Sequence, residues 1–230
     1  MLRLAVFDLD GTLKQERDPY LYLHRRLGKL AEVEASGLFA RGFNGEISYE
    51  TWLRLDAAFW RGTPRARLWQ YFRENAYLPG ARETIAALQA AGVEVAILST
   101  GLLLHVEQVA EELSIRHYLG NEIGFVEEAG EWVVGEAVRV HLPLHGKGAA
   151  LQALQARLDI SPGETLAVGD TRGDIPLFEG AAVSVSVQPS HPEVAQAADI
   201  VLPEPDLRPL LSQVRDHAPG WCPVVITPTV

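Results

Sequence analysis

Short apolar runs alternate with amphipathic helical segments along most of this chain, and this alternation limits its possible folds more than any other feature. Five runs have the length and apolar character of strands that are buried on both faces. They are residues 2–7, 93–98, 165–168, 182–187 and 199–202. Apolar residues at i, i+3 and i+4 spacing predict helices over residues 83–91, 106–113 and 148–158. The pattern predicts an α/β protein with a Rossmann-like, doubly wound parallel sheet that helices cover on both faces.

Residues 14–79 interrupt this alternation, because they contain no convincing strand and are rich in helix formers, arginine and aromatic residues. We interpret them as an inserted helical cap domain, so that the α/β core domain comprises residues 1–13 and 80–230. Within the cap, four large side chains fall on one helical face, and we expect this stripe to pack rather than to bind a ligand. They are Tyr49, Trp52, Leu53 and Trp60.

Two further segments depart from the strand and helix pattern. A second, shorter insert is expected over residues 118–145, where the alternation in residues 131–140 after Gly130 indicates a β-hairpin. The segment from Pro203 onward contains six prolines, among them Pro223 and Pro228. It predicts a loop-rich extension that packs on the domain.

Pairs of aspartates follow two of the predicted strands. Asp8 and Asp10 belong to the sequence Asp-Leu-Asp-Gly-Thr-Leu, and Asp170 and Asp174 follow residues 165–168. We expect both loops to meet at the carboxyl edge of the sheet, where open α/β sheets bind ligands. Four converging carboxylates require a cation, and an oxygen-only ligand set favours Mg²⁺. Taken alone, an Asp-x-Asp-Gly sequence is equally well explained by aspartates that cap turns.

Ser99, Thr100 and Gly101 end the strand predicted over residues 93–98 and precede a helix. Hydroxyl and backbone N–H groups there can bind an anion at the helix N-terminus, although such a sequence is more often simply an N-cap. Lys147 opens the helix predicted over residues 148–158, where the helix dipole disfavours a positive charge. A buried anion beside Lys147 would explain this placement.

In order and context, these residues resemble the four motifs of the phosphatases of the haloacid dehalogenase superfamily. The motifs are residues 8–13, Ser99, Lys147, and Gly169-Asp170 with Asp174. The chain is most similar to the phosphoserine phosphatase branch, which also places a helical cap after its first motif. The resemblance covers nearly the whole core. It implies a phosphomonoesterase that acts on a small phosphorylated metabolite in two steps.

The resemblance also implies a role for each matched residue. Asp8 would attack phosphorus to give an aspartyl-phosphate, and Asp10 would protonate the leaving group and then activate water. Ser99, Thr100 and Lys147 would hold the phosphate oxygens. Asp8, the backbone carbonyl of Asp10, and Asp170 would bind Mg²⁺, while Asp174 would orient Lys147 or a metal-bound water.

Some positions differ from that branch. Gly173 stands where the fourth motif commonly has an asparagine, and Arg17 and Asp56 stand where the substrate's ammonium and carboxylate are bound. We therefore expect phosphoserine not to be the preferred substrate. Because Glu16 and Arg54 lie close to these positions, a phosphoserine phosphatase proper remains the alternative.

Other activities are compatible with parts of the pattern. A dehalogenase does not need Asp10, because a halide leaves without a proton. A phosphomutase would share the core residues and differ in the cap. A receiver-like phospho-aspartate switch also uses Mg²⁺, Asp, Ser/Thr and Lys, but its acceptor lies on a later strand and it has no cap. A noncatalytic scaffold would require carboxylates that bind no metal.

The charge balance of the chain argues against large anionic partners. The chain has 230 residues and a net charge of −10 without a Lys/Arg run, so we expect it to bind neither nucleic acid nor membranes. Residues 14–79 nevertheless contain 11 Lys/Arg and 8 Asp/Glu, which would attract an anionic substrate toward the cap. The single cysteine, Cys222, and the lack of a long apolar segment favour a cytoplasmic location.

Overall fold

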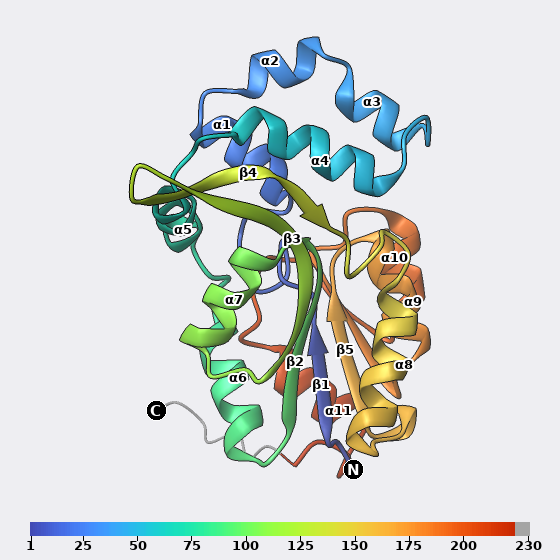
Figure 1. Cartoon of the computed structure of the whole chain (residues 1–230). Helices are drawn as coiled ribbons and strands as arrows, with labels where there is room; N and C mark the ends of the chain where they lie inside the picture. The colour runs from blue at the N-terminus through green and yellow to red at the C-terminus, as the bar shows by residue number, and fades with distance from the viewer. Residues whose placement is uncertain (224–230) are drawn as a thin grey trace.

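A computed structural model describes residues 1–223, so Pro228 of the proline-rich segment lies outside the described residues. The core is a seven-stranded sheet with the order β4-β3-β2-β1-β5-β6-β7 (Figure 1). The β3 and β4 pair is antiparallel and every other neighbouring pair is parallel. The strands are β1 (Leu4–Phe7), β2 (Glu94–Leu102), β3 (His117–Glu128), β4 (Glu131–Arg139), β5 (Thr165–Gly169), β6 (Val183–Val187) and β7 (Ile200–Leu202).

Helices cover both faces of the sheet, as the sequence predicts. One face packs against α6 (Ala81–Ala90), α7 (Leu103–Glu112) and α11 (Leu210–His217), and the other against α8 (Lys147–Leu158), α9 (Ile175–Glu179) and α10 (Pro192–Ala197). Within β1, Ala5 and Phe7 pack on the face covered by α6, α7 and α11, whereas Leu4 and Val6 pack on the face covered by α8, α9 and α10. Because successive side chains of a strand point to opposite faces, a strand buried on both sides must be apolar throughout. The sheet is therefore doubly wound.

Five helices occupy most of residues 14–79, the segment for which we propose a cap domain. They are α1 (Pro19–Arg26), α2 (Leu30–Ala35), α3 (Leu38–Phe43), α4 (Tyr49–Trp60) and α5 (Arg65–Glu74). In Figure 1, α1 to α4 lie above the carboxyl ends of the central strands. Buried Leu53 and Trp60 of α4 share an apolar cluster with Ile123 and Val134 of the β3–β4 hairpin. The hairpin therefore supports the cap helices.

Two sequence predictions need correction. The segment at residues 118–145 contains the expected hairpin, but β3 also pairs with β2, so one arm of the hairpin is part of the main sheet. The segment from Pro203 onward is less loop-rich than predicted, because α11 buries Leu210, Leu211 and Val214 against the core. Its prolines flank this helix rather than interrupt it, which is why their number misled the prediction.

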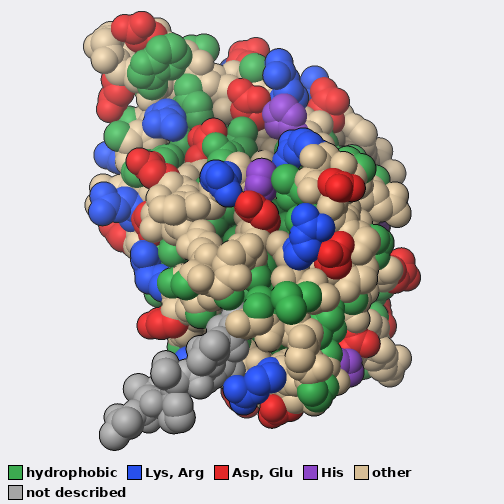
Figure 2. Space-filling model, turned by 90° about the horizontal axis from the view of Figure 1, so that it is seen from below, with side chains coloured by type: hydrophobic (Ala, Val, Ile, Leu, Met, Phe, Trp, Pro, Cys, Tyr) green, Lys and Arg blue, Asp and Glu red, His purple; other side chains and the backbone are tan. Residues whose placement is uncertain are grey.

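The surface at the end of the molecule opposite the cap carries charges of both signs (Figure 2). Figure 2 shows the end of the molecule opposite the cap, where basic and acidic side chains are interspersed and form no continuous basic surface among the described residues of that face. Within residues 1–223, none of the helices has the length and apolar character needed to cross a membrane.

Candidate active site

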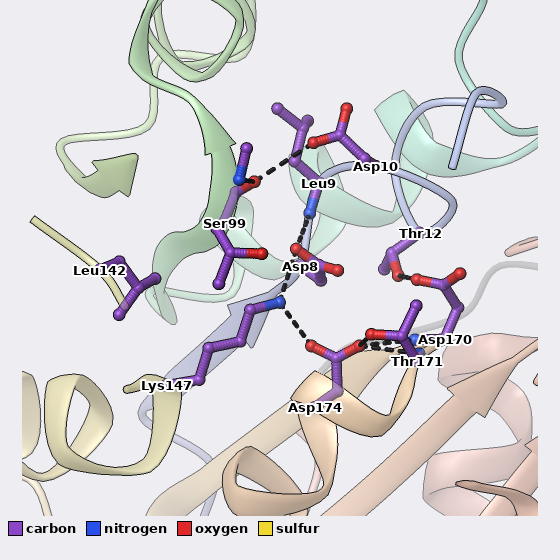
Figure 3. A network of polar contacts seen from close by, with 12 residues as sticks. Asp8, Leu9, Asp10, Thr12, Ser99, Leu142, Lys147, Asp170, Thr171 and Asp174 are labelled. Carbon is purple, nitrogen blue, oxygen red and sulfur yellow. Dashed lines mark hydrogen bonds and ion pairs between the residues drawn. The ribbon is translucent and has the colours of Figure 1, made fainter. Parts of the chain in front are cut away.

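Asp8, directly after β1, forms an ion pair with Lys147 at the carboxyl edge of the sheet (Figure 3). The Nζ atom of Lys147 lies 2.8 Å from Oδ1 of Asp8 and 2.6 Å from Oδ1 of Asp174. Lys147 is the first residue of α8 and is 1% exposed. The anion that explains a lysine at this helix start is therefore a pair of buried carboxylates.

Asp170 and Asp174 come from the turn after β5. The Oδ2 atom of Asp174 accepts hydrogen bonds from the backbone N–H groups of Asp170 and Thr171, at 3.1 and 2.9 Å. Asp170 accepts one from the Thr12 hydroxyl at 3.1 Å, while its Oδ2 atom is buried and has no hydrogen-bond partner among the described residues. The Nε atom of Arg17 lies 3.6 Å from that oxygen, so the two groups form an ion pair but not a hydrogen bond.

The three carboxylates form a compact acidic cluster. One oxygen each of Asp8, Asp170 and Asp174 lies within 4.8 Å of the others. Burial and the neighbouring Asp174 raise the pKa of Asp8 to about 7, against the opposing effect of Lys147. Burial and the charge of Asp8 raise the pKa of Asp170 well above its usual range. Because Lys147 and the more distant Arg17 supply two positive charges against three carboxylates at this edge, the cluster suits a divalent cation with oxygen ligands.

Asp10 points away from this cluster and is held by two other groups. Its Oδ2 atom accepts a hydrogen bond from the Ser99 hydroxyl at 3.2 Å, and its Oδ1 atom lies 3.0 Å from Nδ1 of His105. The His105 ring is buried and stacks on Phe72, with the ring centroids 4.3 Å apart. A Cβ atom at Gly101 would lie 2.5 Å from Oδ2 of Asp10, so glycine is needed for this close approach.

The interpretation of Ser99 and Thr100 as N-cap residues is wrong. Strand β2 continues through both residues to Leu102, and Leu102 is itself the N-cap residue of α7, without a side-chain hydrogen bond. Strand pairing with β3 resumes at Leu102 after a register shift, which keeps the backbone extended beyond Ser99. The Thr100 carbonyl accepts hydrogen bonds from the hydroxyls of Tyr20 and Tyr49, at 3.1 and 2.6 Å.

A cavity of about 160 Å³ lies between the core and the cap helices and brings most of the predicted site residues together. Asp8, Asp10, Ser99 and Thr100 line it from the core. Lys147, Asp170 and Asp174 do not line the cavity and lie beneath or beside Asp8. The cavity is small, so it suits a metabolite rather than a folded protein substrate.

Some of the charged residues of the cap face the cavity and others do not. Arg17 and Asp56 line the cavity, whereas Arg41 and Arg54 are exposed and lie outside its lining. The packing interpretation of the α4 stripe is right for Trp60, and Leu53 is buried in the same apolar cluster while it also lines the cavity. Tyr49 and Trp52 also line the cavity, because α4 extends from the cluster to the site.

Several residues around the site were not predicted from the sequence. His105 lies in the apolar run Leu-Leu-Leu-His-Val, where a buried polar residue is itself a signal that a partner is needed. Asp18 before Pro19 has the local pattern of an N-cap, and its side chain accepts hydrogen bonds from the backbone N–H groups of Tyr20 and Leu21. His24 carries no comparable signal, because its partner Asp56 lies 32 residues away on α4.

The chain is similar to known phosphatases over most of its length. A family model described as haloacid dehalogenase-like hydrolase matches residues 5–179. A phosphoserine phosphatase of Mycobacterium tuberculosis is 28% identical over 209 residues, which are 91% of this chain and 49% of that protein. The phosphoserine phosphatase of Methanocaldococcus jannaschii is 25% identical over 213 residues, which are 93% of this chain and 98% of that protein.

The chain thus spans about half the length of the first relative and nearly all of the second. Among solved structures, a substrate-bound phosphoserine phosphatase complex has a TM-score of 0.76 at 25% identity, covering 93% of this chain and 98% of that one. A phospho-aspartyl intermediate analogue of phosphoserine phosphatase has a TM-score of 0.75 at 25% identity, covering 92% of this chain and 98% of that one.

Proposed function

Because the chain belongs to the haloacid dehalogenase-like hydrolase family and is a phosphatase, we propose that it is a Mg²⁺-dependent phosphomonoesterase for a small metabolite. The reaction passes through an aspartyl-phosphate on Asp8. The observation that carries this proposal is the placement of Asp8, which is paired with Lys147 and lines a cavity that also contains Asp10 and Ser99.

In the first step, a carboxylate oxygen of Asp8 attacks phosphorus and the bond from phosphorus to the ester oxygen breaks. Lys147 beside Asp8, together with Ser99 and Thr100 at the end of β2, binds the phosphate oxygens as charge moves onto them. Asp10 gives its proton to the departing alkoxide, which leaves as an alcohol. Such proton transfer typically contributes about 10²- to 10⁴-fold to the rate.

In the second step, water attacks the phosphorus of the aspartyl-phosphate. Asp10, which is now ionised, accepts the proton of that water, and the carboxylate of Asp8 is regenerated as phosphate forms. The hydrogen bonds from Ser99 and His105 fix the Asp10 side chain at the edge of the cavity, where it can serve both steps. Asp174 holds Lys147 in place and also fixes the turn after β5.

The residues present fit a magnesium ion. Asp8, the backbone carbonyl of Asp10, and Asp170 would hold it. The buried Oδ2 atom of Asp170 has no hydrogen-bond partner among the described residues and contacts Arg17 at 3.6 Å, so it would be available as a ligand atom. A bound Mg²⁺ would supply positive charge that shields the phosphate from the attacking carboxylate.

The direct test of this proposal uses a simple aryl phosphate. Hydrolysis should cease when a chelator removes divalent metal and should return with added Mg²⁺. Wild-type protein should form an acid-stable phosphoenzyme that hydroxylamine cleaves, and Asp8→Asn should bind phosphate yet form none. Activity that survives complete chelation, or wild-type turnover by Asp8→Asn, contradicts the proposal.

The similar proteins favour phosphoserine as a second candidate substrate, because the relatives above carry that activity in their names. Phosphoserine adds an ammonium and a carboxylate to its phosphate, and a closed cavity must neutralise both. Glu16 pairs with Arg25 on the exposed surface, and Arg54 is exposed. Neither residue therefore restores the charge pattern that a phosphoserine site would use.

A further inference from the structure

Aromatic rings make up half of the cap residues that line the cavity. Five of them come from α1, α3 and α4: Tyr20, Phe39, Phe43, Tyr49 and Trp52. Three of these rings meet Trp52, with centroid distances of 4.9 Å to Phe43 and 6.5 Å to both Phe39 and Tyr49. The hydroxyl groups of Tyr20 and Tyr49 are 3.1 Å apart. These contacts make the five rings one continuous wall.

Asp56 stands in this wall as a buried carboxylate with a fixed orientation. It is 2% exposed, and its Oδ1 atom lies 2.8 Å from Nε2 of His24. The indole Nε1 of Trp60 donates to Nδ1 of His24 at 3.0 Å. Because an indole N–H can only donate, Nδ1 is unprotonated and the ring proton lies on Nε2. His24 therefore orients Asp56 as an uncharged donor and does not neutralise it.

Asp18 adds a second carboxylate to the same wall. Its Oδ1 atom accepts hydrogen bonds from the backbone N–H groups of Tyr20 and Leu21, at 3.0 and 2.9 Å, and so caps α1. Burial raises the pKa of Asp18, and the charges of Asp56 and Asp10 add to this effect. The two cap carboxylates are thus close enough to repel each other, and a cation between them and the rings would stabilise both.

The protein itself supplies little positive charge at this end of the cavity. Of the described lining residues, Arg17 carries the one positive side chain. Its guanidinium already has other partners, because it donates to the Gln188 carbonyl and pairs with Asp170 of the acidic cluster. Arg41 and Arg54 are exposed and outside the lining. The charges of Asp18 and Asp56 therefore face the cavity without a basic partner among the described residues.

We propose that this aromatic and acidic wall binds a cationic nitrogen of the substrate. The substrate is accordingly the phosphate monoester of a small amino alcohol that has no carboxylate. An ammonium gains from aromatic faces and from nearby carboxylates, most strongly where water is excluded. A carboxylate on the substrate would instead meet Asp18 and Asp56. This inference rests on the proposed phosphatase function, because it assigns the leaving group of that reaction.

The test compares kcat/KM for four phosphate esters. They are phosphoethanolamine, phosphocholine, phosphoserine and 3,3-dimethylbutyl phosphate, in which carbon replaces the charged nitrogen of phosphocholine. We expect the better of the two amino-alcohol esters to exceed both phosphoserine and the neutral ester by at least about tenfold, a difference of about 1.4 kcal/mol. Phosphoserine as the best of the four, or a neutral ester that equals phosphocholine and phosphoethanolamine, would overturn the inference.

Two variants show whether the cap carboxylates cause this preference. Asp56→Asn keeps an oxygen for the His24 donor, and Asp18→Asn keeps a good N-cap for α1, so both remove charge while retaining the hydrogen bonds. Each should lower the preference for the cationic over the neutral ester by about threefold or more, because each removes one ion-pair contact with the substrate's cation. Glu50→Gln removes an exposed carboxylate from the same helix and should leave the ratio unchanged.

The chemical step is checked separately with p-nitrophenyl phosphate, which carries no cation. Hydrolysis of this ester together with no preference for cationic esters refutes the inference alone. Absence of its hydrolysis refutes the proposed function. In that case, calorimetric affinities of the wild-type protein for phosphocholine and for the neutral ester decide the inference, and equal affinities overturn it.

Discussion

Replacement of Lys147 by methionine should destabilise the metal-free protein strongly. The Lys147 ammonium is 1% exposed and contacts Asp8 and Asp174 at 2.8 and 2.6 Å. Lys147→Met keeps most of the side-chain volume but leaves the buried carboxylates without their basic partner. Removal of one member of a buried ion pair typically costs about 3–5 kcal/mol. We expect a loss of this size in the free energy of unfolding at pH 8.

The size of this loss should depend on pH and on metal. Burial and Asp174 raise the pKa of Asp8 to about 7 in the folded protein. At pH 5, Asp8 is therefore mostly protonated and needs no counter-ion, so the loss should be smaller than at pH 8. Saturating Mg²⁺ should recover part of the loss at pH 8, because it supplies positive charge to the same carboxylates.

The assay is urea-induced unfolding in the presence of a chelator at pH 5 and pH 8. Lys29→Met is the matched control, because Lys29 forms an exposed pair with Glu32 at 2.9 Å, for which a cost of at most about 1 kcal/mol is usual. A loss below about 1 kcal/mol for Lys147→Met at pH 8 would refute the reasoning. It would mean that the acidic cluster does not depend on the lysine for its charge balance.

Asp10→Asn should slow the hydrolysis of alkyl phosphates about 100-fold more than that of aryl phosphates with good leaving groups, since poor leaving groups depend on its proton; equal losses would assign Asp10 a structural role. His105→Ala should lower kcat on alkyl phosphates more than it changes KM, because His105 holds Asp10 rather than substrate; a change confined to KM would contradict this. The stability of the metal-free wild-type protein should fall as pH rises from 4 to 7. Asp8 stays protonated in the folded state up to about pH 7 but ionises near 3.8 when unfolded, so unfolding releases a proton in this window. A flat profile in a denaturant series with chelator would show that burial does not raise its pKa.

The sequence allowed the sheet and the position of its ligand-binding edge to be predicted because both depend on local patterns. Residues 2–7 and 165–168 are uninterrupted apolar runs, and the aspartates follow each run directly. Parallel pairing of β1 with β5 is then enough to bring Asp8 and Asp170 to the same edge. This part of the site needs no knowledge of side-chain packing.

The remainder of the site depends on contacts between distant segments. His105 meets Asp10 across 95 residues, and His24 meets Asp56 across 32. No periodicity links such partners, because each pair forms only when separate helices pack together. The extension of β2 beyond Ser99 was not predicted for a similar reason. Leu102 pairs with Asn121 of β3, and this pairing continues the strand where the local sequence suggests a helix start.

The Thr100 carbonyl joins the cap to the backbone beside Ser99. Tyr20 and Tyr49 from the cap and Asn121 from β3 all donate to this one oxygen. A movement of α1 and α4 away from the core would break the two tyrosine hydrogen bonds and leave Asn121 as the one donor to this oxygen among the described residues. Opening of the cap would therefore loosen, without releasing, the peptide group that follows Ser99, the residue that we propose to bind phosphate.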